Sequence, residues 1–268
     1  MRLSAGERIG TYAVLGVFTV MALYPLVAIL VTALQSEVVG GGGIHWENFA
    51  TAWTQARFGS YLWSSVIVSA CVVVLSVVLS VLAAYAFGTM SFRGRDVLFY
   101  LLLLGLTVPG EAIVVPLYYD LRDLGMTDTY WALILPQVAQ SVAFGAFWLR
   151  TYFRSTSRSI VEAARIDGAG HWLTLWRVLV PMGRPALVTL VVLVFMWTWN
   201  EFLLARVMIT SEAYRTAPLG LQFFSGRATT SVPLLAAASV LVALPVVVVY
   251  LFLQRHFIKG MIDGSVKG

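Results

Sequence analysis

Charged residues are scarce in this sequence. Only 12% of its 268 residues are charged, whereas 59% are hydrophobic; an ordinary soluble domain has about 25% charged residues. A single domain of this length needs a polar surface to stay in water. The composition therefore excludes a soluble enzyme.

The residues that build disulfides, metal sites and nucleotide sites are also few. A single cysteine, Cys71, excludes an intramolecular disulfide, and the only lysines, Lys259 and Lys267, each precede a glycine, so no GxxxxGK[ST] loop exists. The three histidines show no metal-binding spacing and stand at His45, His171 and His256. We expect no catalytic residue, and neither a metal nor a cofactor bound by this chain.

Long apolar runs are abundant instead. A membrane-spanning helix needs about 20 mostly apolar residues, and six segments meet this requirement. We therefore predict an all-α integral membrane protein with six transmembrane helices in one transmembrane domain over residues 1–268. The spans are expected at about 10–34, 63–88, 97–119, 129–149, 186–206 and 231–253.

Arginine and lysine are unevenly divided between the two sides of these spans. The segments on the side of the amino terminus hold 13 of them, and the opposite segments hold five. Because cytoplasmic loops carry the excess of positive charge, we expect both termini in the cytoplasm. The first span is longer than the apolar core of a secretory signal and is interpreted as an uncleaved anchor. The basic residues lie between apolar runs, so we expect no nucleic-acid partner.

The second span contains small residues four positions apart, which allow another helix to approach closely. These are Ser76, Ser80, Ala84 and Gly88. Packing inside the helix bundle is one interpretation, and an interface with another subunit is the other.

Residues 150–184 form a connection between the fourth and fifth spans that is far longer than two adjacent helices need. Apolar residues recur there at helical spacing, and Gly168 and Gly170 divide the run into two short helices. An apolar helix face at the cytoplasmic surface indicates a partner groove. The alternative is an amphipathic segment that lies on the lipid interface.

This connection carries a recognisable motif. Glu162, Ala163 and Ala164 are followed by Gly168 and then by the run Val-Leu-Val-Pro at 178–181. The pattern resembles the EAA motif of permease subunits in bacterial ATP-binding-cassette (ABC) importers, in which EAA, three residues, glycine and nine residues precede I-x-L-P. The sequence departs from it only by the two valines.

Further segments are similar to the MalG-like permease subunits of carbohydrate importers. They include the run from Ile166 to Ala169, which contains Asp167, the run W-T-W-N-E-F at 197–202, and a tail that contains Gly264 and Lys267. The resemblance covers nearly the whole chain and implies a permease of the bacterial inner membrane that imports a sugar or an oligosaccharide.

The resemblance also implies partners. These are a second, related permease subunit, two ATPase subunits that bind ATP and Mg²⁺, an extracytoplasmic solute-binding protein and the lipid bilayer. A coupling helix would dock in a cleft of the ATPase, and Lys267 and Gly264 would contact the ATPase dimer. The implied coupling residues are Glu162, Ala163, Ala164, Asp167, Gly168 and Gly170.

Polar residues within spans are costly and usually face a bundle interior or a cavity. Glu111 follows Pro109 and Gly110, so the third span is expected to kink or break there. Glu111, Asn200, Glu201 and Trp197 are candidates for the solute pathway, because such groups hydrogen-bond hydroxyls or stack on a sugar. The alternative is that they hold helix ends or the partner subunit.

Two other functions fit some of these observations. A glycerol-phosphate or other polyol importer would use the same architecture. A proton-coupled secondary transporter would use Glu111 and Glu201 as a relay, although the two halves of the chain show no convincing repeat. A membrane scaffold without transport is disfavoured by the EAA spacing.

Overall fold

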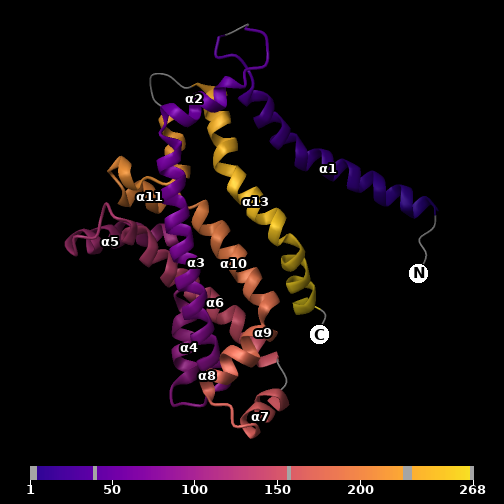
Figure 1. Cartoon of the computed structure of the whole chain (residues 1–268), viewed down its shortest axis with the longest axis vertical. Coiled ribbons are helices and arrows are strands. Elements are labelled where there is room, and N and C mark those ends of the chain that lie inside the picture. The colour runs from indigo at the N-terminus through magenta and orange to yellow at the C-terminus, as the bar shows by residue number, and fades with distance from the viewer. Residues whose placement is uncertain (1–4, 39–40, 156–157, 226–230, 266–268) are drawn as a thin grey trace. The chain divides into compact units, whose positions relative to one another are not determined.

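The computed structural model describes residues 5–38, 41–155, 158–225 and 231–265 (Figure 1). Within these residues the chain is helical and contains no β-strand. It divides into two compact units, one of residues 1–59 and 220–244 and the other of residues 60–219 and 245–268. A single transmembrane domain over residues 1–268 stays a prediction.

The first unit holds the long amino-terminal helix α1 (Ala5–Ala33) and the short helix α2 (Glu47–Gln55). No residue of the most apolar stretch of α1 is buried. The buried Asn48 of α2 donates its amide to the carbonyl oxygens of Ala33 and Gln35, both at 2.9 Å. These bonds satisfy backbone acceptors that a helix end leaves without partners. Helix α2 therefore fixes the end of α1.

The second unit holds most of the helices. They are α3 (Phe58–Thr89), α4 (Arg95–Leu104), α5 (Gly110–Asp123), α6 (Tyr130–Ser155), α7 (Arg158–Ile166), α8 (His171–Thr174), the π-helix η1 (Leu175–Leu179), α9 (Val180–Met182), α10 (Arg184–Trp199), α11 (Leu203–Met208) and the 3-10 helix η2 (Glu212–Tyr214). The helices α12 (Ala217–Gly220) and α13 (Val232–Ser265) have residues in both units, as does α3 through its first two residues, and η3 (Leu221–Phe224) lies in the first unit.

Four of the described helices are long and apolar enough to cross a membrane. These candidate spans are Gly6–Ala33, Phe58–Thr89, Tyr130–Arg154 and Val232–Gln254. They correspond to the first, second, fourth and sixth predicted spans. A bent pair, His171–Met182 and Arg184–Trp199, gives a fifth candidate, whose second helix matches the start of the span predicted over 186–206.

The third predicted span, 97–119, is not one continuous helix. Helix α4 ends at Leu104, and α5 begins only at Gly110. Pro109 precedes α5 with extended backbone angles, φ −59° and ψ 129°, because proline cannot continue a helix from the preceding turn. The break therefore falls where Pro109 and Gly110 indicate it. The fifth helix is also shorter than predicted, since α10 ends at Trp199.

The small residues of the second span pack inside the chain. Ser76, Ser80 and Ala84 are fully buried on α3. Gly145 of α6 lies against Ser80 so closely that a Cβ at position 145 would stand 2.2 Å from the Ser80 Oγ and 3.0 Å from the Leu190 side chain of α10. The stripe therefore serves close packing of α3, α6 and α10, as the first of its two interpretations predicts.

Candidate functional site

Helix α7 carries the EAA residues on the surface of the second unit. Glu162 and Ala163 are exposed, and Ala164 is half-buried. Figure 1 shows α7 at the same end of the second unit as α8. Ile166, in the last turn of the helix, is 86% exposed. The last turn of α7 therefore presents a large apolar side chain at the surface of this chain.

Gly168 ends α7 with a left-handed turn. Its φ is +81°, its N–H donates to the carbonyl of Arg165 at 3.0 Å, and the N–H of Ala169 donates to the carbonyl of Ala164 at 2.9 Å. These two bonds form a Schellman motif, in which the left-handed position is usually glycine. Asp167 and Gly170, the remaining predicted coupling residues, are exposed on either side of the turn.

A second helical segment leads from this turn to α10. Residues His171–Met182, formed by α8, η1 and α9, are called the connecting helix below. Its middle is a π-helix, in which the N–H of Val180 donates to the carbonyl of Leu175. Pro181 follows directly and has no N–H for an ordinary helical bond, which accounts for the change of hydrogen-bond register. The connecting helix meets α10 at an angle of 79°.

One face of the connecting helix is buried and the other is exposed. Thr174, Leu175 and Leu179 are at most 1% exposed, which fixes the helix against its own unit. The opposite face presents large apolar side chains, namely Trp172, Leu173 and Trp176. Ile166 of α7 is exposed as well, and exposed apolar side chains in this segment are expected both for a partner groove and for a lipid interface.

Hydrogen bonds fasten both ends of the connecting helix to long helices. At its start, His171 Nδ1 lies 2.9 Å from the hydroxyl of Tyr85 on α3. At its end, the Tyr152 hydroxyl of α6 donates to the carbonyl of Met182 at 2.7 Å. Gly183 then packs so closely that a Cβ would lie 3.1 Å from the carbonyl oxygen of Leu179. The spacing of the EAA motif gave no signal for either tyrosine.

The structure does not gather the predicted pathway residues into one site. The Asn200 side-chain amide donates to the carbonyl of Met196 in its own helix at 2.8 Å, and the Glu201 carboxylate accepts the N–H of Leu204 at 2.7 Å. Glu111 is exposed in the first turn of α5. These positions are those expected of residues that hold helix ends. Contact of any of them with solute stays a prediction.

Trp197, the fourth pathway candidate, is 49% exposed. Its ring stands edge-on to Phe144 of α6, with the ring centres 5.0 Å apart. The indole therefore supports the contact between α10 and α6 while part of it stays accessible.

A cavity of about 220 Å³ lies between α3, α10 and α13. Ser69 contributes a hydroxyl that is buried without a hydrogen-bond partner among the described residues. None of the four predicted pathway residues lines this cavity, and its mostly apolar wall does not offer the hydrogen bonds that a sugar needs. The lining residues are Val66, Ser69, Ala70, Val73, Val191, Phe195, Trp199 and Val249.

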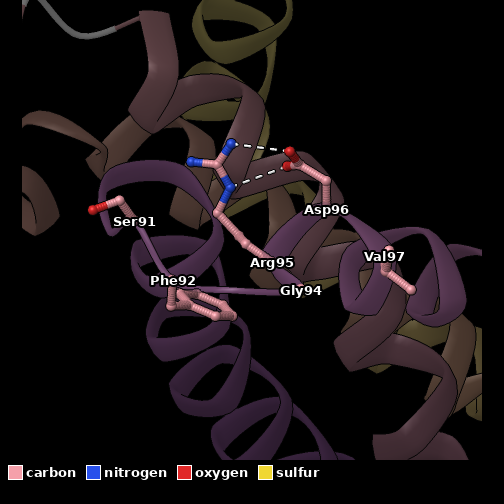
Figure 2. Close-up of a pocket in the computed structure, with 6 residues that line it drawn as sticks. All are labelled: Ser91, Phe92, Gly94, Arg95, Asp96 and Val97. Atoms are coloured by element: carbon pink, nitrogen blue, oxygen red, sulfur yellow. Dashed lines mark hydrogen bonds and ion pairs between the residues drawn. The ribbon is translucent and has the colours of Figure 1, made fainter.

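An open pocket of about 340 Å³ lies at the start of α4, where Ser91, Phe92 and Gly94 contribute to its wall (Figure 2). Arg95 donates two hydrogen bonds to the Asp96 carboxylate, at 3.0 and 3.2 Å. The bond from Arg95 lowers the pKa of the Asp96 carboxyl.

Asp96 is also linked to α6. The guanidinium of Arg150 donates to the Asp96 carboxylate at 3.4 Å and to the carbonyl of Phe87 at 3.1 Å. It lies over the ring of Phe99, 3.8 Å from the ring centre. In the sequence these arginines count only toward the positive charge that sets the orientation, whereas in the structure they join the end of α3, the start of α4 and the end of α6.

The predicted carboxyl-terminal contact lies at the edge of the described region. Gly264 belongs to α13, whereas Lys267 lies outside the described residues. Among the described residues no group of three His, Cys, Asp or Glu side chains is arranged to hold a metal ion.

Residues 76–263 match the model of the family described as the inner membrane component of binding-protein-dependent transport systems. The chain belongs to this family. The matched region contains the EAA residues, the connecting helix and α10. Membership confirms the resemblance to ABC importer permeases and decides against a proton-coupled secondary transporter. The chain is thus an inner-membrane transport component with several apolar helices.

Relatives of this permease cover most of its length. It is 39% identical over 224 residues to the probable ABC transporter permease protein YurM of Bacillus subtilis, covering 84% of this chain and 74% of YurM. It is 32% identical to the diacetylchitobiose uptake system permease protein NgcG of Streptomyces coelicolor, over 95% of this chain and 87% of NgcG.

A solved structure shares the fold. It is a bacterial ABC transporter involved in the import of the acidic polysaccharide alginate, and one of its chains superposes with a TM-score of 0.79 and 26% identity. The match covers 96% of this permease and 99% of that chain.

Proposed function

We propose that this permease forms half of the translocation pathway of an ATP-driven importer for a sugar or an oligosaccharide. The observation that carries the proposal is the EAA segment, which forms an exposed helix ended by a glycine turn inside the family region. The solute class is supported by NgcG, whose name refers to diacetylchitobiose, and by the alginate importer. A glycerol-phosphate or polyol importer is the alternative solute class.

The proposed arrangement in the bacterial inner membrane has six spans with both termini in the cytoplasm. Helices α4 and α5 are the two parts of the third span, and the Pro109 break separates them. A second, related permease completes the pathway. This sequence has no phosphate-binding lysine motif, so the proposed complex takes its ATP and Mg²⁺ sites from two separate ATPase subunits. An extracytoplasmic protein delivers the solute, in keeping with the family description.

Helix α7 is the proposed contact with the ATPase. The exposed Glu162 carboxylate anchors the helix to a basic group of the ATPase, and the exposed Ile166 enters an apolar part of the cleft. The Gly168 turn sets the direction in which the chain leaves this contact. When two ATPases close on nucleotide, a docked helix moves with them as a rigid body, and this movement reaches the spans.

Replacement of Glu162 by Gln tests the docking. Truncating or neutralising one partner of a buried charge pair costs about 2–5 kcal/mol, which corresponds to a loss of affinity of at least about 30-fold. We expect Glu162→Gln to reduce both the co-purification of the ATPase and solute transport in proteoliposomes. The solute affinity of the binding protein stays unchanged.

Asp120→Asn is the matched control, since Asp120 is an exposed carboxylate on α5. This variant is expected to keep normal ATPase retention and transport. If Glu162→Gln behaves like the control, α7 lies on the lipid interface and the docking assignment is wrong. Screening the binding protein with oligosaccharides, polyols and glycerol phosphate separates the two solute classes.

A further inference from the structure

The connecting helix is held at both of its ends, and the first attachment involves an unusually placed tyrosine. Tyr85 lies near the end of α3 and is only 4% exposed. Its hydroxyl is 2.9 Å from His171 Nδ1, and the two rings meet edge-on with centres 6.1 Å apart. Tyr85 is 86 positions before His171, so this contact joins two distant parts of the chain.

The position of His171 places this hydrogen bond where a movement of α7 would enter the connecting helix. His171 is the first residue of the connecting helix and comes directly after Gly168, Ala169 and Gly170. Gly168 and Gly170 have no atoms within 4 Å of an added Cβ, so the turn itself is loosely surrounded. At its amino-terminal end α7 follows α6, and at its carboxyl-terminal end a movement of α7 passes through this turn before it reaches the connecting helix and α10. The contact between Tyr85 and His171 is at the first residue after this turn.

We propose that Tyr85 is a positioning residue for coupling: its hydroxyl fastens the first turn of the connecting helix to α3, so that movement of α7 is passed to α3. The proposal rests on the coupling role of α7. At the far end, Tyr152 holds Met182 and thereby joins the same rigid segment to α6. Without the bond at Tyr85, the first turn moves against α3 and the glycine turn absorbs part of the displacement.

The test uses the complete importer in proteoliposomes and measures solute transported per ATP hydrolysed. We expect Tyr85→Phe, which keeps the ring and removes the hydroxyl, to lower this ratio at least threefold while ATPase retention stays normal. His171→Ala lowers it equally. Tyr12→Phe is the matched control, because Tyr12 is an exposed tyrosine on α1, and it leaves the ratio unchanged.

Two combinations separate a shared contact from two independent effects. Asn carries a hydrogen-bonding atom close to the position of His Nδ1. In the presence of Tyr85, His171→Asn is therefore expected to keep the parental ratio of solute transported to ATP hydrolysed, unlike His171→Ala. The double variant Tyr85→Phe with His171→Ala is expected to lower the ratio no further than either single variant, since both substitutions remove the same hydrogen bond. An additive loss contradicts the proposal.

Other results also overturn it. If Tyr85→Phe lowers transport and ATP hydrolysis in proportion, the residue is merely structural, and if it changes neither, the bond transmits nothing. When Glu162→Gln is harmful in the same preparation, these results remove the role of Tyr85 alone. When Glu162→Gln is also silent, docking through α7 fails and the coupling role of Tyr85 fails with it.

Discussion

Replacing Gly168 by Ala separates the backbone requirement of the EAA turn from any contact with a partner. Gly168 has a φ of +81° and no atom within 4 Å of an added Cβ. A methyl group there meets no steric obstacle inside the chain, so only the left-handed backbone opposes it. That conformation costs an L-residue about 1–2 kcal/mol. The cost falls on the two Schellman bonds that end α7.

The expected consequence is local opening of the turn. A change of 1–2 kcal/mol corresponds to roughly a 5- to 30-fold change in an equilibrium. The amide of Ala169, which donates to the Ala164 carbonyl, should therefore exchange with deuterium roughly 5- to 30-fold faster in Gly168→Ala. Amide exchange of the isolated permease in detergent, without ATPase, measures this directly. Gly168→Asn should have a smaller effect, since Asn tolerates the left-handed region.

Gly170→Ala is the matched control. Gly170 is two positions away and equally open, but its φ of −68° suits any residue. In Gly170→Ala the amide of Ala169 should exchange with deuterium at the same rate as in the parent protein. Equal exchange in Gly168→Ala and Gly170→Ala would refute the argument that the left-handed angle requires glycine. A loss of ATPase retention in Gly168→Ala with unchanged exchange would instead place the requirement in the partner's cleft.

Two further predictions concern packing and orientation. Gly145→Ala should lower the thermal midpoint of the permease in detergent, since overpacking against Ser80 costs about 1–3 kcal/mol; Gly16→Ala, in open space, should not change it, and equal midpoints would contradict the close packing. A cysteine at Gly42 should be labelled from outside intact cells, and a reporter active only in the cytoplasm should work when fused after Gly268. Labelling of Gly42 only after permeabilisation would reverse the orientation.

The sequence alone determined the features that depend on neighbouring residues. A run of about 20 apolar residues predicts a span whatever lies around it, because the hydrocarbon core demands that length. Four predicted spans accordingly match long apolar helices. Pro109 locates the break between α4 and α5, since the missing N–H is a local property. The EAA spacing likewise located α7, and Gly168 its turn.

Tertiary structure decided which distant side chains meet. In the sequence, Gly145 and Ser80 are ordinary small residues. Their close approach follows only from the way in which α6 packs against α3. Tyr85 and His171 are paired across 86 positions. Apolar periodicity defines the faces of each helix, whereas such contacts depend on the angles at which the helices pack.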